Sequence, residues 1–290
     1  MEREYPEPDQ NPLIAFVHIP KTAGSTLNSI LSREYAPEEL HEIMMRGMSW
    51  IAMQPRLVPK PLLSFSKIQR LKSALRHPRR VRAIHGHFDM SIMKLLPAGA
   101  RCFTLLRDPV ERAISHYYHY RRMTGDPVHA LAMQSTLAQW VASRGLVEMD
   151  NGQTRRLAGE MNLPFGRVNS GMLDRAKSNL SAFAAVGLTE RFEESLILFQ
   201  RAFGWTLRPF TARNVADNRP RCAEVSGEAL AAIDRCNRYD LELYRFASDL
   251  FEGAAGRIDM AGELARLRDA HGTRRAPRNE GAAAVDYAAM

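Results

Sequence analysis

The sequence predicts an α/β fold: a mainly parallel sheet covered by helices on both faces, with a helical C-terminal part. Short apolar runs alternate along the chain with stretches of helical periodicity, the order that gives parallel strands joined by crossover helices. The 290 residues are 45% hydrophobic, which is ordinary for a globular protein. Polar turns follow three of the expected strands, and in a parallel sheet such turns meet at one edge, where ligands bind.

The elements follow from local patterns, taken in chain order. Residues 13–19 contain an apolar run that stops at Pro20, and helical periodicity begins just after Gly24, with Leu27 and Leu31 on one face. The same reasoning predicts strands at 13–19, 81–85, 102–106 and 183–188, and helices at 25–34, 109–122, 151–159, 172–180, 190–203 and 227–251.

The domain organisation is expected to be simple, because no Pro/Gly/Ser-rich linker divides the chain. We expect a polar N-terminal extension (1–12), a single domain (13–251), and a C-terminal segment (252–290) with a helix and a disordered tail rich in Arg, Ala and Gly. No apolar run approaches the ~18 residues of a membrane span, and the polar, acidic start does not resemble a signal peptide.

The cysteines indicate a reducing compartment. They are odd in number and widely spaced, at Cys102, Cys222 and Cys236, which predicts free thiols rather than a disulfide framework. Together with the expected absence of a signal peptide and membrane span, this predicts a cytoplasmic protein.

The net charge of +8 favours an anionic partner without choosing among nucleotide, polysaccharide, nucleic acid and membrane surface. The charge is uneven, because residues 56–82 hold nine Lys and Arg residues and no Asp or Glu. That segment is either a solvated basic face or one wall of a channel for an acidic acceptor.

The turn after the first strand has the character of a phosphate-binding site. Its backbone N–H groups and the positive end of the following helix would face an anion, and a Lys adds a movable point charge. Only six of the 40 basic residues are Lys, and one lies here. The spacing of a Walker A loop is absent, and the alternative is a surface Lys after a strand. The turn reads His18-Ile19-Pro20-Lys21-Thr22-Ala23-Gly24-Ser25-Thr26.

A second polar turn follows the strand at 102–106. Asp108, Pro109 and Glu111 are a helix N-cap, first residue and capping box, so Arg107 lies where strand becomes helix. Ser115 interrupts an otherwise apolar and aromatic helix surface. The planar fork of Arg suits a fixed phosphate. Alternatively, Arg107 pairs with Asp108 or Glu111, and Ser115 is a small packing residue.

The third strand-end feature is the pair His85 and His87, separated by Gly86. A His-x-His pair could ligate a metal from one face of a strand, but no further ligand with supporting spacing follows, so we predict no metal site. A histidine at the end of an inner strand is often merely hydrogen-bonded.

These motifs resemble those of sulfotransferases that use 3′-phosphoadenosine 5′-phosphosulfate (PAPS), in the membrane-type carbohydrate family, sulfotransferase family 2. The resemblance is to heparan sulfate and uronyl 2-O-sulfotransferases, and the Arg-rich composition suits a bacterial member. It implies a P-loop-like sheet in which Lys21 and its turn hold the 5′-phosphosulfate and Arg107 and Ser115 hold the 3′-phosphate. The implied donor-site residues are Lys21, Thr22, Ala23, Gly24, Ser25, Thr26, Arg107 and Ser115.

The same resemblance supplies a third interpretation of the histidines, since those enzymes carry a catalytic histidine in a His-Gly-His string. It implies that His87 is the general base and that His85 orients it or contacts the acceptor, and which of the two is the base stays open. Residues 151–159, 172–180 and 186–195 are similar to further strings of the family. Thr189 is either near the adenine or a helix N-cap. Arg121, Arg122 and Arg155 are candidates for acceptor contacts.

The implied function is in-line transfer of a sulfuryl group from PAPS to a hydroxyl, most naturally of a saccharide, with PAP (adenosine 3′,5′-bisphosphate) as product and no metal. No nucleic-acid partner is expected. The animal members form trimers, which raises the prospect of a homo-oligomer. Two alternatives are an atypical P-loop kinase and a non-catalytic protein that binds a nucleotide or an anionic polymer.

Overall fold

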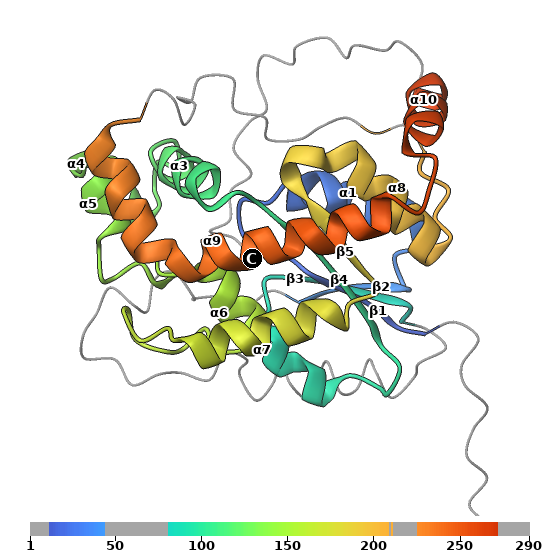
Figure 1. The fold of residues 1–290 in the computed structure, drawn as a ribbon, viewed down its shortest axis with the longest axis horizontal. Helices are drawn as coiled ribbons and strands as arrows, with labels where there is room; N and C mark the ends of the chain where they lie inside the picture. The colour runs from blue at the N-terminus through green and yellow to red at the C-terminus, as the bar shows by residue number, and fades with distance from the viewer. Residues whose placement is uncertain (1–11, 44–80, 209, 211–224, 272–290) are drawn as a thin grey trace, which may run out of the picture.

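The computed structural model describes residues 12–43, 81–208, 210 and 225–271. At the centre of this part of the chain is a sheet of five parallel strands in the order β2-β3-β1-β4-β5 (Figure 1). The predicted α/β class and parallel sheet are confirmed. The strands are β1 (Ile14–Val17), β2 (Leu40–Ile43), β3 (Ala83–Gly86), β4 (Arg101–Leu106) and β5 (Ala185–Leu188).

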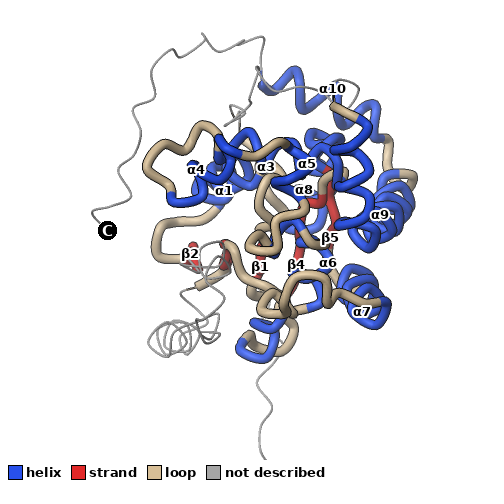
Figure 2. The backbone as a smooth tube through the Cα atoms, turned by 90° about the vertical axis from the view of Figure 1, so that its left-hand side faces the viewer, coloured by secondary structure: helices blue, strands red, loops and turns tan. Residues whose placement is uncertain are grey.

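Helices lie on both sides of the sheet, with α1 and α8 on one side and α7 on the other (Figure 2). Short 3-10 turns occur at Met90–Leu95, Val147–Met149 and Thr189–Arg191. The described helices are α1 (Gly24–Glu34), α3 (Pro109–Tyr120), α4 (Pro127–Gln134), α5 (Leu137–Val141), α6 (Gly152–Ala158), α7 (Ser170–Ser181), α8 (Phe192–Phe203), α9 (Gly227–Ala255) and α10 (Met260–His271).

The two faces of the sheet bury separate apolar layers, because successive side chains of a strand point to opposite sides. Phe16 packs with Leu27 of α1 and Phe199 of α8 in one layer. Its neighbour Val17 belongs to the other layer, which includes Leu173 of α7. A strand that is buried on both faces has little alternation of apolar and polar residues, which is why these strands read as continuous apolar runs.

The predicted strands and helices are all present, with ends that shift by a few residues. The first strand is shorter than expected and ends at Val17, before the turn that contains Lys21. The elements β2, α4 and α5 were not predicted. Two of them carry readable signals, since Asp126 caps α4 and Thr136 forms a capping box with Gln139 in α5.

Helix α9 is divided by a kink at Asn237, whose φ of −126° and ψ of 24° are not helical. Before the kink, Ile233 packs with Trp140 of α5 in a third apolar cluster. After the kink, Leu243 and Phe251 join the layer beneath the sheet. One helix therefore connects the core of the sheet to the α3–α5 region.

Several expectations fall outside the described residues: most of the basic segment 56–82, Cys222, and the tail from residue 272. Cys102 and Cys236 are both free thiols. Among the described helices, none combines the length and apolar character needed to cross a bilayer.

Candidate active site

The turn at residues 18–24, called the Lys21 turn below, joins β1 to α1 at the carboxyl end of the sheet. Lys21 and Ala23 adopt φ values of 70° and 62°, the left-handed region that non-glycine residues seldom enter. The buried Thr22 hydroxyl donates to the Ile19 carbonyl at 2.8 Å and closes the turn. Backbone held in this way at a functional edge is typical of anion-binding concavities.

The start of α1 favours a negative ligand. Its N-cap residue, Ala23, provides no side-chain hydrogen bond, and its first turn contains no acidic residue. The positive end of the helix dipole is therefore not offset by a capping carboxylate of the helix itself. The helix start is therefore open to an anion, and phosphate binding by this turn remains a prediction.

His18 is stacked inside the turn. Its ring centroid lies 5.3 Å from that of Phe16 and 4.1 Å from that of His87. A Cβ atom on Gly24 would lie only 1.7 Å from Nε2 of His18, so the ring occupies the space above the glycine. Gly24 is therefore required by close approach of the His18 ring, and burial lowers the pKa of His18 so that the ring is uncharged.

His87 is bonded directly to the Lys21 turn. Its Nδ1 lies 3.1 Å from the carbonyl oxygen of His18. A carbonyl oxygen only accepts, so this geometry assigns the proton to Nδ1 and leaves the lone pair on Nε2. Burial, followed by the charge of Arg156, lowers the pKa of His87 to about 4, which makes it a neutral ring and proton acceptor near pH 7.

His85 has a different environment. It lies within β3, buried, and its Nδ1 has no hydrogen-bond partner among the described residues. Burial, followed by His41 and His87, lowers its pKa to about 4. His87, in contrast, is partly exposed just beyond the end of the strand.

Arg107 links the second turn to the first. Its Nη1 donates to the carbonyl oxygen of Lys21 at 3.1 Å, so the two predicted phosphate-binding turns are in contact. The guanidinium also lies 3.4 Å from a Glu111 oxygen and 3.9 Å from a Glu190 oxygen. The alternative in which Arg107 pairs with Glu111 is thus also realised. Ser115 lies on α3, partly exposed.

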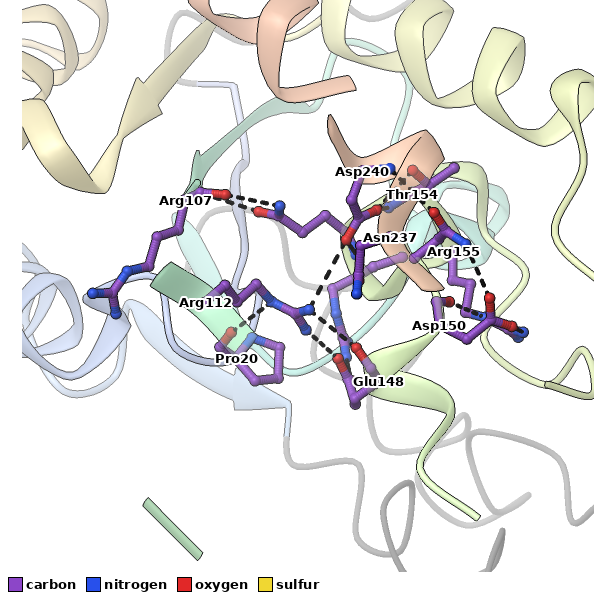
Figure 3. A network of polar contacts seen from close by, with 12 residues as sticks. Pro20, Arg107, Arg112, Glu148, Asp150, Thr154, Arg155, Asn237 and Asp240 are labelled. Atoms are coloured by element: carbon purple, nitrogen blue, oxygen red, sulfur yellow. Dashed lines mark hydrogen bonds and ion pairs between the residues drawn. The ribbon is translucent and has the colours of Figure 1, made fainter. Parts of the chain in front are cut away.

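A buried ionic cluster lies beneath the Lys21 turn and was not predicted (Figure 3). Glu148 accepts a hydrogen bond from Arg112 at 2.5 Å and another from Arg156. Arg112 also donates to the carbonyl oxygen of Pro20 at 3.2 Å, and Arg156 donates to that of Phe88 at 3.2 Å. The cluster therefore ties the Lys21 turn to the segment that carries His87.

The charged groups of this cluster are closely paired. Burial alone would raise the pKa of Glu148, but Arg156 and Arg112 outweigh it and hold the pKa at about 2, so the carboxylate is ionised. Two guanidiniums then share one carboxylate, with Asp240 4.0 Å from Arg112. Two guanidiniums and two carboxylates are thus packed together next to the Lys21 turn, which Arg112 contacts through the Pro20 carbonyl.

The arginine candidates divide clearly. Arg155 is fully buried and bonded to Asp150, so the expectation that it contacts an acceptor is wrong. Arg121 donates to the Tyr117 hydroxyl at 2.9 Å, and Arg122 is exposed. Thr189 donates to the Leu106 carbonyl at 2.9 Å. In the described part of the chain, no cluster of His, Cys, Asp and Glu side chains is arranged to hold a metal ion.

Several known proteins are similar in sequence to this chain. Human heparan-sulfate 6-O-sulfotransferase 2 is 29% identical over 275 residues, which cover 82% of this chain and 44% of that protein. Human heparan-sulfate 6-O-sulfotransferase 1 is 31% identical over 177 residues, 51% of this chain and 43% of that protein. The chain thus spans less than half the length of these two relatives. Their names specify 6-O sulfation, whereas the motifs resembled 2-O enzymes.

A solved structure of mouse sulfotransferase SULT7A1 complexed with PAP is a distant structural neighbour, with a TM-score of 0.38 and 15% identity over 80% of this chain and 66% of that one. The family model described as galactose-3-O-sulfotransferase matches residues 3–290. That match includes both polar turns, the His85–His87 segment and the buried cluster. The chain belongs to the galactose-3-O-sulfotransferase family, a family of carbohydrate sulfotransferases.

Proposed function

We propose that this protein transfers the sulfuryl group of PAPS to a hydroxyl group of a saccharide. The observation that carries the proposal is the hydrogen bond between Nδ1 of His87 and the His18 carbonyl. It attaches a neutral proton acceptor to a turn whose backbone and charge suit an anion. A sulfotransferase needs these two functions side by side.

The donor would be bound by the two turns together. Lys21 and the N–H groups of residues 22–26 hold the 5′-phosphosulfate, while Arg107 and Ser115 hold the 3′-phosphate. This division supports selection of PAPS over ATP, which lacks a 3′-phosphate. The Glu148 cluster holds the Lys21 turn in place for this role, because Arg112 donates to the Pro20 carbonyl within the turn.

The chemical step is an in-line displacement. Nε2 of His87 takes the proton of the acceptor hydroxyl while the acceptor oxygen forms a bond to sulfur. The bond between sulfur and the oxygen of the 5′-phosphate breaks, and PAP leaves with the electron pair. Besides holding the bound donor, Lys21 meets the negative charge that develops on this departing oxygen and so also stabilises the transition state.

His85 acts as a helper in this scheme, through its neighbour. It is buried in β3, and its pKa is lowered by burial and, to a smaller extent, by His41 and His87. We assign the base to His87 because only its hydrogen bond to the turn fixes which nitrogen is free.

The acceptor class comes from the relatives, whose names specify heparan sulfate. A net charge of +8 suits such an acidic polymer. The experiment is turnover with ³⁵S-labelled PAPS on desulfated heparan sulfate, a galactose-terminated oligosaccharide, a tyrosine peptide and buffer alone. Label is expected in a saccharide. Binding of PAP without label transfer to any acceptor would favour the non-catalytic alternative, and hydrolysis of ATP with magnesium would favour a kinase.

A further inference from the structure

The backbone around Arg107 is held by side chains from distant parts of the chain. The Arg107 N–H donates to Oε1 of Gln153 at 3.0 Å, and Nε2 of Gln153 donates back to the Arg107 carbonyl at 2.9 Å. On either side, Thr189 donates to the Leu106 carbonyl, and Glu190 accepts from the Asp108 N–H at 3.1 Å. The strand has ended here, and these contacts continue its role of fixing the backbone.

The pairing requires a primary amide at position 153. One side-chain group must accept from an N–H and donate to a C=O of the same residue, and among side chains only Asn and Gln combine a carbonyl with an NH₂. Gln153 is fully buried, so its two bonds are made away from competing water. Loss of either bond would leave a half-buried backbone group of Arg107 without this partner.

Gln153 is itself fixed by a junction between α6 and α9, of which Thr154 and Asp240 are labelled in Figure 3. The Asp240 carboxylate in α9 accepts from the N–H groups of Gln153 at 3.1 Å and Thr154 at 2.7 Å. In return, Oδ1 of Asn151 accepts from the N–H groups of Tyr239 at 2.8 Å and Asp240 at 3.2 Å. Each helix thereby caps the other where α9 restarts after its kink.

We propose that Gln153 is a positioning residue for Arg107 and thereby sets the preference of the site for a nucleotide that carries a 3′-phosphate. The proposal rests on the proposed function, in which Arg107 binds that phosphate. From the backbone position that the amide holds, the Arg107 guanidinium donates to the Lys21 carbonyl at 3.1 Å. A fork-shaped donor loses its bidentate geometry when its backbone rotates, while a single-point charge does not.

The test is calorimetric titration with two defined probes, PAP and AMP, which differ by the 3′-phosphate. Wild type should prefer PAP, and Arg107→Ala should lose that preference. Gln153→Met, which keeps volume and removes both bonds, should reduce the ratio of PAP to AMP affinity by roughly tenfold. Its AMP affinity should stay within about twofold of wild type.

Thr154→Val is the matched control. It removes the neighbouring hydroxyl that donates to Asp240 at 2.8 Å but touches no group of Arg107. It should lower stability and leave the affinity ratio unchanged. Should Gln153→Met fail to fold, Gln153→Glu decides, because a carboxylate of the same size accepts from the N–H but cannot donate to the carbonyl.

The proposed function and the positioning role of Gln153 are contradicted by different outcomes. Equal affinity of wild type for PAP and AMP overturns the proposed function. A wild type that discriminates, an Arg107→Ala variant that does not, and a folded Gln153 variant with the wild-type ratio together overturn the positioning role. Equal weakening of both ligands in the Gln153 variants also overturns it, since that is the behaviour of a merely structural residue.

Discussion

The Lys21 turn and the Glu148 cluster are in contact, yet they are built in opposite ways. The turn presents the partly exposed side chains of Lys21 and Ala23 on an unusual backbone. The cluster consists of Arg112, Glu148 and Arg156, all buried and each bonded to more than one partner. The groups proposed to meet the ligand are thus separate from the groups that fix their positions. Substitutions in the two regions should therefore affect different measurements.

The largest expected effect on stability comes from the cluster. Glu148→Gln keeps the shape of the side chain but leaves two buried guanidiniums without their shared counter-charge, and should lower the free energy of unfolding by about 3–5 kcal/mol. Lys21→Ala should change it by less than about 0.5 kcal/mol, because the side chain is partly exposed. Urea denaturation measures both. Equal losses would remove the distinction between the two regions.

The largest expected effect on catalysis comes from His87. His87→Ala should lower turnover by about 10²–10⁴-fold, the usual worth of a positioned proton acceptor, while PAP affinity stays close to wild type. Lys21→Ala should weaken both, since it contacts the donor before and during the reaction. If folded His85→Ala is the inactive variant and His87→Ala is not, the base has been assigned to the wrong ring.

A smaller effect tests how tightly the two regions are joined. Gly24→Ala places a methyl group where the His18 ring lies and must displace that ring, and with it the carbonyl bonded to His87. We expect a loss of about 1–3 kcal/mol in stability together with reduced turnover. Gly227→Ala, at the start of α9 in open space, is the control and should show neither effect. Thermal unfolding and steady-state rates of the two variants provide the comparison.

The last prediction is that mild acid has almost no effect on activity. A base acts when deprotonated, and His87 has a pKa lowered to about 4, chiefly by burial and Arg156, so it stays deprotonated well below neutral pH. The value of kcat/KM for the donor should remain level from pH 7 to about pH 5.5. A histidine with an ordinary pKa of ~6.5 would lose about tenfold over that range. Such a loss in the folded protein would contradict the environment described for His87.

Much of the fold and the exposed part of the site follow from local sequence. Continuous apolar runs identify β1 and β4, and the parallel order they imply brings the turns at Lys21 and Arg107 to one edge, where the structure has them in contact. The strand β2 was missed because only Ile43 in it is buried, so its pattern carries little apolar signal. Periodicity reports burial, and an edge strand with exposed residues lacks it.

The buried cluster could not be predicted because its partners are far apart in the chain. Arg112 and Glu148 are separated by 36 positions, and Gln153 bonds Asp240 across 87. Arg155 and Arg156 are adjacent, yet one pairs with Asp150 and the other with Glu148. The local sequence pattern predicts that an arginine lies on a helix, but it does not predict which carboxylate the arginine pairs with. Only the tertiary packing decides that.

The junction of α6 with α9, just after the kink at Asn237, affects when the site can become ordered during synthesis of the chain. Both polar turns are present once residue 115 has been synthesised, but the amide that holds Arg107 depends on an α9 carboxylate near residue 240. Chains grow from the N-terminus, so the start of α6 and the start of the second half of α9 are capped only after this late segment arrives. We therefore expect fragments that stop before α9 to contain every recognisable motif and yet lack an ordered Arg107. A truncated form of this protein that is to keep the site intact should therefore include all of α9.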